Sequence, residues 1–268
     1  MGDLITISDD NWIEHATHIG PDGLPRAKGL VSRDWMKHPQ GCLAVAPSFD
    51  LDLIPESEWA ARIADQEANQ SSLQHIRDHG NYGGQIPTYD QDGKGYCWAH
   101  SSTSAVTLAR AANNEPYVPL SAFAVACIIK GYRDQGGNGI DSLQFIADRG
   151  IPSAQFWPMK SMSQANDKPE TWANAALHKC VKFLDCSDDP QLRRQQVATA
   201  SLLGLPVIAD YNWWSHSVCL IRVMSPTKTR IFNSWGDSWS QQGVGDLDGS
   251  KAWPDDAWVV VTEAVSQT

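Results

Sequence analysis

The chain has 268 residues, of which 42% are hydrophobic and 19% are charged, and its formal net charge is −10. This length holds one catalytic domain with an extension, or two small domains, and the hydrophobic content argues against wholesale disorder. Because no cluster of Lys and Arg offsets the acidic balance, nucleic acid and an anionic membrane surface are poor candidates as partners.

Targeting signals and cysteine usage set the expected environment. No hydrophobic run is long enough to cross a bilayer, and the first residues lack the basic and apolar regions of a secretory signal, so we expect no membrane partner. Met1-Gly2 with Thr6 fits the minimal N-myristoylation pattern, but the neighbouring residues are acidic, and we expect a plain N-terminus. The six cysteines form no CxxC pair and are too sparse for a disulfide scaffold. We therefore expect free thiols, no metal, no cofactor, and a cytoplasmic or other reducing compartment.

The first 80 residues divide into an irregular part and a helical part. Residues 1–55 are rich in Gly, Pro and Asp and predict extended segments and turns. Residues 55–80 predict one helix, which Pro55 precedes, Ser57 caps and Gly80 ends. Its apolar stripe is thin, which indicates that this helix packs against another part of the protein.

Helices come first in the remaining chain and strands follow. A Gly-rich loop over residues 81–95 leads into predicted helices at 97–114, 120–130 and 140–150. Short β-branched or aromatic runs then predict strands at residues 180–186, 204–211, 217–224, 229–235 and 257–263. This order predicts an α+β protein in which a helical half and an antiparallel sheet half enclose a cleft.

Cys97 stands where the Gly-rich loop passes into the first of these helices. A thiol at a helix N-terminus faces unpaired N–H groups and the positive end of the helix dipole, and both stabilise the nucleophilic thiolate. The alternative is a small buried cysteine with no reactive role. By position alone, neither interpretation is favoured over the other.

A thiolate nucleophile needs a general base, and the base needs a partner that orients it. His216 stands at the entry to a predicted strand, and Asn233 ends the next strand in sequence. Neighbouring antiparallel strands would bring these two residues side by side, where the amide oxygen of Asn233 can hold one imidazole nitrogen. Trp235 can then shield that bond from water.

Four sequence blocks carry a resemblance to a known family. In chain order they are QDGKGYCWAHS, GGNGIDSLQFIADRGI, SHSVCLIRV and RIFNSWGDSWSQQGVGDL. Together they resemble the papain-like cysteine proteases over roughly residues 83–262. The resemblance implies the papain-like α+β fold, with a helical left half, an antiparallel β-sheet or barrel as the right half, and the active site in the cleft between them.

The resemblance also implies roles for individual residues. Cys97 matches the family's nucleophile, His216 its general base, and Asn233 the amide that orients the base. Gln91 matches the side chain that donates a hydrogen bond to the oxyanion. The positions that line the substrate cleft in the family correspond to Trp98, Asn138, Gly139, Ser215 and Trp235.

The sequence departs from the family around the active site, so we regard it as a divergent relative. Lys94 and Gly137 stand where the family has the two cysteines of an active-site disulfide. Their absence fits a reducing compartment and leaves the loop around Gly93 less tightly held. Tyr96 replaces a small residue, so we expect it to crowd the cleft. Ile140 replaces a glycine of the cleft loop, which argues against substrate-backbone pairing at that position.

Two further departures flank the site. His100 replaces an aromatic residue one helical turn after Cys97. We expect it to take the place of the aromatic in the core with its ring hydrogen-bonded, and the alternative is contact with the thiolate. Only Asn212, Trp213 and Trp214 stand where the family has a long excursion. That side of the cleft is therefore either open or filled by the two tryptophans.

We divide the chain into an N-terminal extension, residues 1–80, and a papain-like peptidase domain, residues 81–268. The extension lacks the residue pattern of the family's inhibitory propeptide. We expect a docking, regulatory or pro-like segment, and the part of the chain through which an assembly partner would bind.

The leading hypothesis is a cysteine-type endopeptidase that hydrolyses peptide bonds through a thioester acyl-enzyme. A second hypothesis is a catalytically weak or inactive papain-fold protein that binds peptide or another subunit in a larger assembly, such as a virus particle, and would then be virion-associated. A third is a Cys-His amidase or transferase that acts on cell-wall peptides or isopeptides. The intact set of Cys97, His216, Asn233 and Gln91 favours the first hypothesis over the second, and the NSWG block favours it over the third.

Overall fold

The structure is a computed structural model that describes residues 2–17, 19, 23, 27–80, 84–180 and 182–261. The α-helices are α1 (Trp12–Ala16), α2 (Glu56–Ala68), α3 (Leu73–His79), α4 (Cys97–Ala112), α5 (Ala122–Lys130), α6 (Gly139–Arg149), α7 (Pro169–Ala175) and α8 (Pro190–Leu202). The strands are β1 (Thr6–Ile7), β2 (Lys182–Asp185), β3 (Val207–Tyr211), β4 (His216–Ser225), β5 (Lys228–Phe232), β6 (Val244–Asp248) and β7 (Asp256–Val261).

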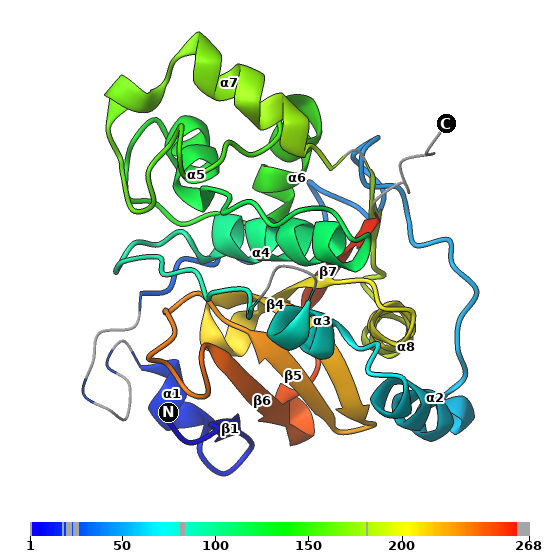
Figure 1. The fold of residues 1–268 in the computed structure, drawn as a ribbon. Helices are drawn as coiled ribbons and strands as arrows, with labels where there is room; N and C mark the ends of the chain where they lie inside the picture. Colours follow the sequence, from blue (N-terminus) through cyan, green and yellow to red (C-terminus); the bar gives the residue numbers. More distant parts are fainter. Residues whose placement is uncertain are drawn as a thin grey trace.

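Helix α4 runs through the middle of the molecule (Figure 1). The helices α5, α6 and α7 lie on one side of it, and the sheet lies on the other. Its sequence is rich in Ala, Ser and Thr, and every residue except Arg110 and Ala112 is buried. A helix that is buried on all sides has to sit between two layers. Cys97, in its first turn, therefore lies at the junction of the helical half and the sheet.

The sheet has the strand order β1-β6-β5-β4-β3-β7-β2. Its pairs are antiparallel except for β1 with β6, which is parallel. In the register of β4 with β5, Cys219 pairs with Phe232. The beginning of β4 and the end of β5 consequently lie at the same end of the sheet, where His216 and Asn233 meet.

The α+β arrangement expected from the sequence is confirmed, with α5, α6 and α7 on one side of α4 and the sheet, flanked by α2, α3 and α8, on the other (Figure 1). The helices predicted between residues 97 and 150 are α4, α5 and α6, and the predicted strands are β2, β3, β4, β5 and β7. Residues 262–263, the end of the last predicted strand, lie outside the described residues. The sequence does not predict β6, α7 or α8, because Gly and Asp interrupt the strand and both helices have weak apolar stripes.

The single helix predicted over residues 55–80 is wrong. The region forms two helices, α2 and α3, because Gln70 adopts a left-handed φ of 52° that breaks the chain direction. Ser72 then caps α3 by accepting a backbone N–H of its first turn. Ser57 lies within α2 instead of capping it. Gly80 ends α3 as predicted.

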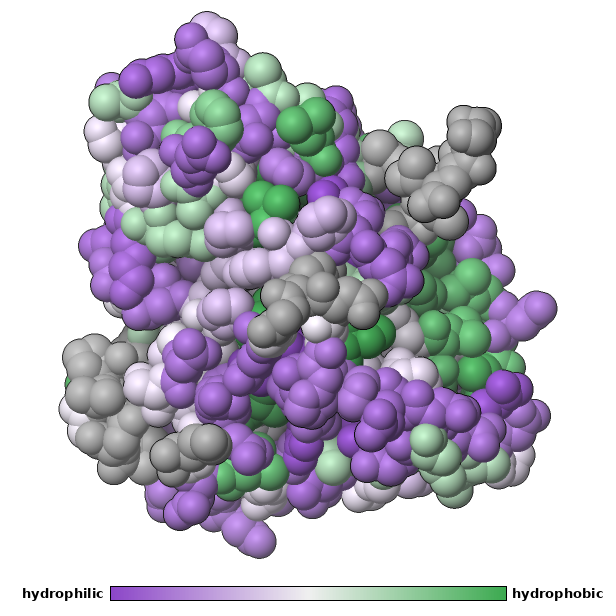
Figure 2. All heavy atoms as spheres, in the orientation of Figure 1, coloured by the Kyte–Doolittle hydropathy of each residue, from purple (hydrophilic) through white to green (hydrophobic). Residues whose placement is uncertain are grey.

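The N-terminal residues are built into the fold. Strand β1 extends the sheet along β6, and α2 lies beside α8 (Figure 1). Phe183 N–H donates to Val45 O, so the extended segment before α2 also follows β2. Figure 2 shows a largely hydrophilic face, whose hydrophobic residues gather at the right of the view beside α8. Within the described residues, no helix is both long and apolar enough to span a membrane.

Candidate active site

Cys97 is the first residue of α4, and its side chain is fully buried. Burial away from water raises the pKa of its thiol to about 12, and the carboxylate of Asp210 adds to the rise. The backbone N–H groups of Ser217, Gly29 and Trp98 oppose this effect, because they point at the sulfur and favour the thiolate. In this arrangement Cys97 is a neutral thiol.

His216 begins β4 and forms a hydrogen bond with Asn233, in which Nε2 lies 2.7 Å from the amide oxygen Oδ1. Its Nδ1 has no hydrogen-bond partner among the described residues. Trp235 stacks on the imidazole with 4.6 Å between ring centres, and Trp214 meets it edge-on at 4.9 Å. Burial lowers the pKa of His216 to about 3, against the opposing effect of the Asn233 hydrogen bond. The ring is therefore neutral, with its proton on Nε2 and a lone pair on Nδ1.

Ser217 links the thiol and the imidazole. It follows His216 in β4, and its backbone N–H points at the sulfur of Cys97. Its hydroxyl oxygen lies 2.6 Å from that of Ser101, one turn along α4. This contact holds the first turn of α4 against the start of β4. The thiol of Cys97 therefore contacts the residue that follows His216, at the junction of the two halves.

Gln91 lies in the loop before α4 and is held by Ser234, the residue after Asn233. The Ser234 hydroxyl donates to Gln91 Oε1 at 2.6 Å, and Gln91 N–H donates to Ser234 O at 2.9 Å. The side-chain Nε2 of Gln91 donates to Ala27 O at 3.1 Å and to Lys94 O at 2.6 Å. The structure thus gathers Gln91 with Asn233, and both N–H groups of the Gln91 amide are engaged.

Residues 27–33 of the N-terminal extension, here called the cleft segment, cross this site. Ala27 O accepts the N–H of Gln91 and also the indole N–H of Trp235 at 3.1 Å. The cleft segment thereby takes one of the two amide donors of Gln91 and helps to exclude water from Cys97. The sequence gives no sign of this contact, because nothing local marks these residues as a partner of the site.

The cleft segment also pairs with the backbone of the cleft. Gly137 N–H donates to Gly29 O at 2.9 Å, and Val31 N–H donates to Gly137 O at 2.8 Å, in a parallel bridge. Between these bonds, Leu30 N–H donates to Ser215 O at 3.1 Å. The backbone groups that flank Cys97 on this side are therefore already paired.

The five residues expected to line the substrate cleft fall into two groups. Ser215 and Trp235 bond to the cleft segment, and Asn138 Nδ2 donates to a backbone carbonyl of the same segment at 2.8 Å. Trp98 and Gly139 lie behind this layer. The Trp98 indole donates to the loop that precedes α4, and Gly139 opens α6 against a buried tryptophan.

Gly137 belongs to the cleft, although in the sequence it stands out only as the position of a missing cysteine. A Cβ at this position would lie 2.7 Å from the ring of Trp98, so no side chain fits there without a shift. The loop before α4 is held without a disulfide. Gly95 N–H donates to Asp134 Oδ1 at 2.8 Å, and Lys94 Nζ lies 3.7 Å from Asp134 Oδ2. All six cysteines are free thiols.

Tyr96 and His100 both point into the core. We expected Tyr96 to crowd the cleft, and this is wrong. Its ring packs edge-on against Phe123, and its hydroxyl donates to Arg133 O at 2.9 Å. His100 takes the expected aromatic place, edge-on to Phe123 at 5.6 Å and to Tyr89 at 6.2 Å. The hydrogen bond expected for its ring is wrong, since neither nitrogen has a partner among the described residues. Burial lowers the pKa of His100 to about 3, so the ring is neutral.

The side of the cleft with the short connection is filled. The turn η3 (Asn212–Trp214) places Trp213 and Trp214 in a stack with 5.3 Å between ring centres. Trp214 Nε1 donates to His15 O at 2.9 Å, and Trp12 meets Trp213 edge-on at 6.1 Å. Helix α1 and the tryptophans therefore close the space that the missing excursion leaves.

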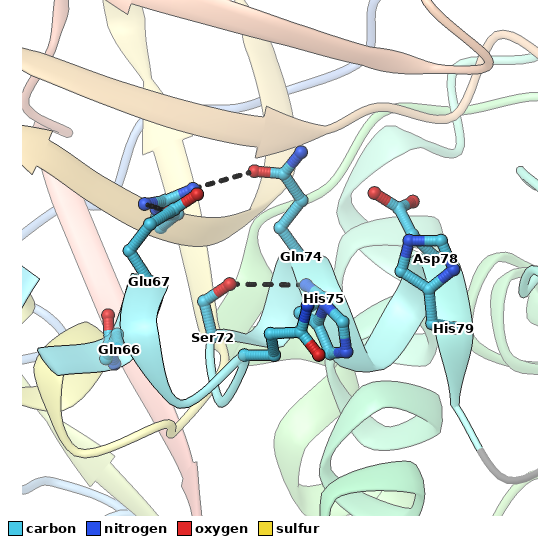
Figure 3. A pocket seen from close by; sticks show the side chains of 9 residues that line it. Gln66, Glu67, Ser72, Gln74, His75, Asp78 and His79 are labelled. Carbon is cyan, nitrogen blue, oxygen red and sulfur yellow. Dashed lines mark hydrogen bonds and ion pairs between the residues drawn. The ribbon is translucent and has the colours of Figure 1, made fainter. Parts of the chain in front are cut away.

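A polar pocket of about 170 Å³ lies elsewhere, between the end of α2, α3 and β4 (Figure 3). His75 and His79 lie one turn apart on α3 with 4.9 Å between ring centres, and Glu67 forms an ion pair with Arg222. Nowhere in the described part of the chain do three or more His, Cys, Asp or Glu side chains group as metal ligands. The residues that line this pocket include none of those around Cys97, so it is separate from the site.

The known structures similar to this chain include cysteine proteases. Xylellain, a cysteine protease from Xylella fastidiosa, has a TM-score of 0.60 and 16% identity over 90% of this chain and 99% of its own. Digestive procathepsin L 3 of the Tenebrio molitor larval midgut has a TM-score of 0.60 and 14% identity over 94% of this chain and 79% of its own. The Carica candamarcensis cysteine protease CMS1MS2, in complex with E-64, has a TM-score of 0.50 and 18% identity over 66% of this chain and 94% of its own.

These similarities concern the fold. No protein-family model matches the sequence, and no curated protein is similar to it in sequence. At identities of 14% to 18%, the similarity supports a shared arrangement of helices and strands, but not shared site residues or activity. The chain has the α+β fold of the papain-like cysteine proteases.

Proposed function

We propose that the protein is a cysteine-type endopeptidase that cleaves peptide or protein substrates through Cys97, His216 and Asn233. The observation that carries the proposal is the 2.7 Å hydrogen bond between His216 Nε2 and Asn233 Oδ1. It leaves Nδ1 without a partner among the described residues, and the next residue, Ser217, points its backbone N–H at the Cys97 thiol at the start of α4. A protein that only binds peptides has no need of this arrangement.

The reaction begins with attack of the Cys97 sulfur on a peptide carbonyl carbon, while the thiol proton passes to His216 Nδ1. Gln91 Nε2 and the Cys97 backbone N–H donate to the oxyanion that forms. His216 then gives the proton to the leaving amine as the C–N bond breaks, and a thioester remains. Water attacks the thioester, His216 takes its proton, and the thiol is restored as the proton returns. Asn233 keeps the imidazole in place throughout.

We further propose that this structure is a resting form, in which residues 1–80 regulate a catalytic domain of residues 81–268. The cleft segment engages Gln91 and the backbone of Gly137, so a substrate can pair there only after the segment leaves. A partner that binds the extension is one means of withdrawing it. The six free thiols suit a reducing compartment.

A second candidate function is that of a papain-fold protein that binds peptide or a subunit without cleaving it, as in a larger assembly. The covered cleft favours it. Burial raises the pKa of Cys97 to about 12 and lowers that of His216 to about 3, so both groups are neutral and the thiol is a poor nucleophile. For the protein to act as an endopeptidase, opening the cleft must lower the pKa of Cys97 and raise that of His216.

Labelling with an epoxysuccinyl inhibitor, followed by mass spectrometry of every cysteine, tests the endopeptidase. The cleft can be opened in the full chain by Gly29→Ala, whose methyl group would meet a backbone carbonyl. We expect selective label on Cys97, loss of peptide hydrolysis in Cys97→Ala, and loss of the label in His216→Ala. Cys42→Ala is the matched control, since that thiol is exposed. If label appears only on Cys42, or if Cys97→Ala still hydrolyses peptides, the endopeptidase is refuted.

A further inference from the structure

Three aspartates are buried at one end of the sheet, and we call them the aspartate pocket. They are Asp185 at the end of β2, Asp210 in β3 and Asp256 at the start of β7, and none is more than 3% exposed. The strand order β3-β7-β2 makes these strands neighbours, and Asp210 pairs directly with Asp256. Buried carboxylates are costly unless a cation or hydrogen bonds compensate them. The aspartate pocket therefore requires a positive partner.

The partner in this structure is Arg33, the last residue of the cleft segment. Its guanidinium forms a two-pronged pair with Asp185, with 2.8 Å from Nη1 to Oδ1 and 2.8 Å from Nη2 to Oδ2. Nη1 also lies 3.2 Å from Asp256 Oδ1. Trp35 stacks on the guanidinium at 3.8 Å, and two backbone carbonyls of the following loop accept N–H groups at 2.7 and 3.0 Å. This planar recognition is typical of a site for arginine.

The aspartate pocket has more acceptors than Arg33 uses. Asp210 Oδ1 and Asp256 Oδ2 are buried and have no hydrogen-bond partner among the described residues. Burial raises the pKa of Asp210 to about 7, and burial with repulsion from Asp210 raises that of Asp256 well above its usual range. Two buried carboxyl oxygens thus remain without a donor while Arg33 is bound, so the aspartate pocket offers acceptors beyond those that anchor this arginine.

The aspartate pocket adjoins the proposed nucleophile. Gly139 N–H, in the cleft loop, lies 3.4 Å from Asp210 Oδ2, and the charge of Asp210 acts on the thiol of Cys97. A groove of about 340 Å³ runs beside the same loop, between residues 31–34 and residues 135–138 among others. A peptide that replaced the cleft segment would therefore run past the aspartate pocket.

We propose that the aspartate pocket is a specificity site, which takes the charged end of an Arg or Lys side chain of the substrate and which Arg33 fills in the resting form. This inference rests on the proposed function, because such a site has a meaning for catalysis only if the chain cleaves peptides. The net charge of −10 also attracts basic peptides. The competing outcome is a pocket that serves only to anchor Arg33.

The first experiment tests the aspartate pocket without any activity assay. In the full chain, Arg33→Ala keeps the β-carbon, so it removes an ethylguanidinium group and leaves the pocket without its cation. We expect ethylguanidinium at millimolar concentration to raise the Tm of Arg33→Ala and to leave that of the wild type unchanged, because a ligand that binds only the folded state stabilises it. Ethylurea, which has a similar shape without the charge, is the matched control. An equal response to both compounds, or none to either, contradicts a cation site.

The second experiment keeps Arg33, so it does not depend on the folding of Arg33→Ala. Peptide pairs carry one Arg or its neutral isostere citrulline at each position around the cleaved bond, and Gly29→Ala in the full chain cleaves them. At one position we expect kcat/KM to be at least about tenfold higher for Arg, because charge-assisted, two-pronged bonds discriminate by this order. Asp256→Asn, added to Gly29→Ala, should reduce that ratio towards one.

The outcomes separate the inference from the function on which it rests. Equal kcat/KM for Arg and citrulline at every position overturns the inference and leaves the aspartate pocket as an anchor for Arg33. No cleavage of any peptide, together with no epoxysuccinyl label on Cys97, refutes the endopeptidase and the substrate claim with it. In that case the ethylguanidinium result still shows whether the pocket binds a cation.

Discussion

The cleft segment reaches Cys97 only because residue 29 has no side chain. A Cβ on Gly29 would lie 2.1 Å from the carbonyl oxygen of Gly95, in the loop before α4. Both groups belong to the backbone, so neither can rotate away as a flexible side chain would. Gly29 does not have a positive φ, so Ala is tolerated by the backbone itself. Gly29→Ala is therefore expected to push the cleft segment away from the site.

The size of this effect follows from the contacts that hold the segment. Opening breaks the hydrogen bonds of Leu30 with Ser215 and of Gly29 and Val31 with Gly137, each of which contributes about 0.5–1.5 kcal/mol net. The cost of breaking these hydrogen bonds is the same in the wild type and in Gly29→Ala. The methyl group adds overpacking of about 1–3 kcal/mol to the closed form alone. The population of the open form should therefore rise by about 5- to 150-fold.

The assay is the rate at which iodoacetamide alkylates Cys97 in the full chain, measured by mass spectrometry. We expect Gly29→Ala to raise this rate by about 5- to 150-fold, in proportion to the open population. In the closed form, burial raises the pKa of Cys97 and lowers that of His216, and Lys28 of the cleft segment lowers the latter further. Opening hydrates both groups, so the thiol pKa falls. Because the thiolate is the reactive form, the rate of Gly29→Ala should reach its half-maximum at lower pH than that of the wild type.

Two controls make the result decisive. Gly84→Ala is the matched variant, since a Cβ at that position would meet no atom within 4 Å, and its rate should equal that of the wild type. Cys42 is exposed and reports the reagent itself. Equal Cys97 rates in Gly29→Ala and the wild type would refute the steric argument. A parallel rise at Cys127 and Cys219, which are buried in the core, would mean general unfolding and would refute it as well.

Three further changes test the site and the fold. Asn233→Ala should lower kcat/KM by about 100-fold, because His216 loses the acceptor that orients it. Steady-state kinetics on chains that also carry Gly29→Ala measure this, and an unchanged kcat/KM contradicts the role of Asn233. Gly137→Ala should lower the free energy of unfolding by about 1–3 kcal/mol, since the new Cβ would lie 2.7 Å from the Trp98 ring; urea unfolding that matches the wild type would argue against the contact. Burial raises the pKa of Asp210 from 3.8 to about 7, so between these pH values the folded state holds a proton that the unfolded state releases. The free energy of unfolding of the wild type therefore falls as pH rises through that interval. Asp210→Asn does not titrate, so its free energy of unfolding relative to that of the wild type should rise between about pH 4 and about pH 8. Urea unfolding across this pH range measures the difference, and a fall would contradict the prediction.

Local signals in the sequence were sufficient for the fold class, whereas the proposed catalytic residues also needed the family resemblance of the four sequence blocks. A Gly-rich loop that ends in an apolar helix marks the start of α4, and with it the position of Cys97. Short β-branched runs mark β4 and β5, and an antiparallel pair of consecutive strands places the beginning of one beside the end of the other. For this reason the sequence alone associates His216 with Asn233. The helix over residues 55–80 failed on one residue, Gln70, whose left-handed φ no propensity reveals.

The occupant of the cleft was decided by tertiary structure alone. The cleft segment has no periodic pattern, because its bonds to Gly137 and Ser215 use the backbone and place no demand on side chains. Val31 and Asn138 are 107 residues apart, and no local rule relates them. The same contacts bury Cys97 and His216, so their protonation states depend on a segment that the sequence does not associate with them.

The aspartate pocket illustrates the same division. Each of its three members stands in a separate run, FLD, VIAD or DDAW, and by itself resembles a polar residue at the end of a strand. Sequence determines that these runs are strands, because β-branched and aromatic residues favour the extended backbone. The order β3-β7-β2 determines that the carboxylates meet, and the path of the N-terminal residues determines that Arg33 lies among them. Strand order and chain path arise from burying many side chains at once, which is why only the folded molecule reveals them.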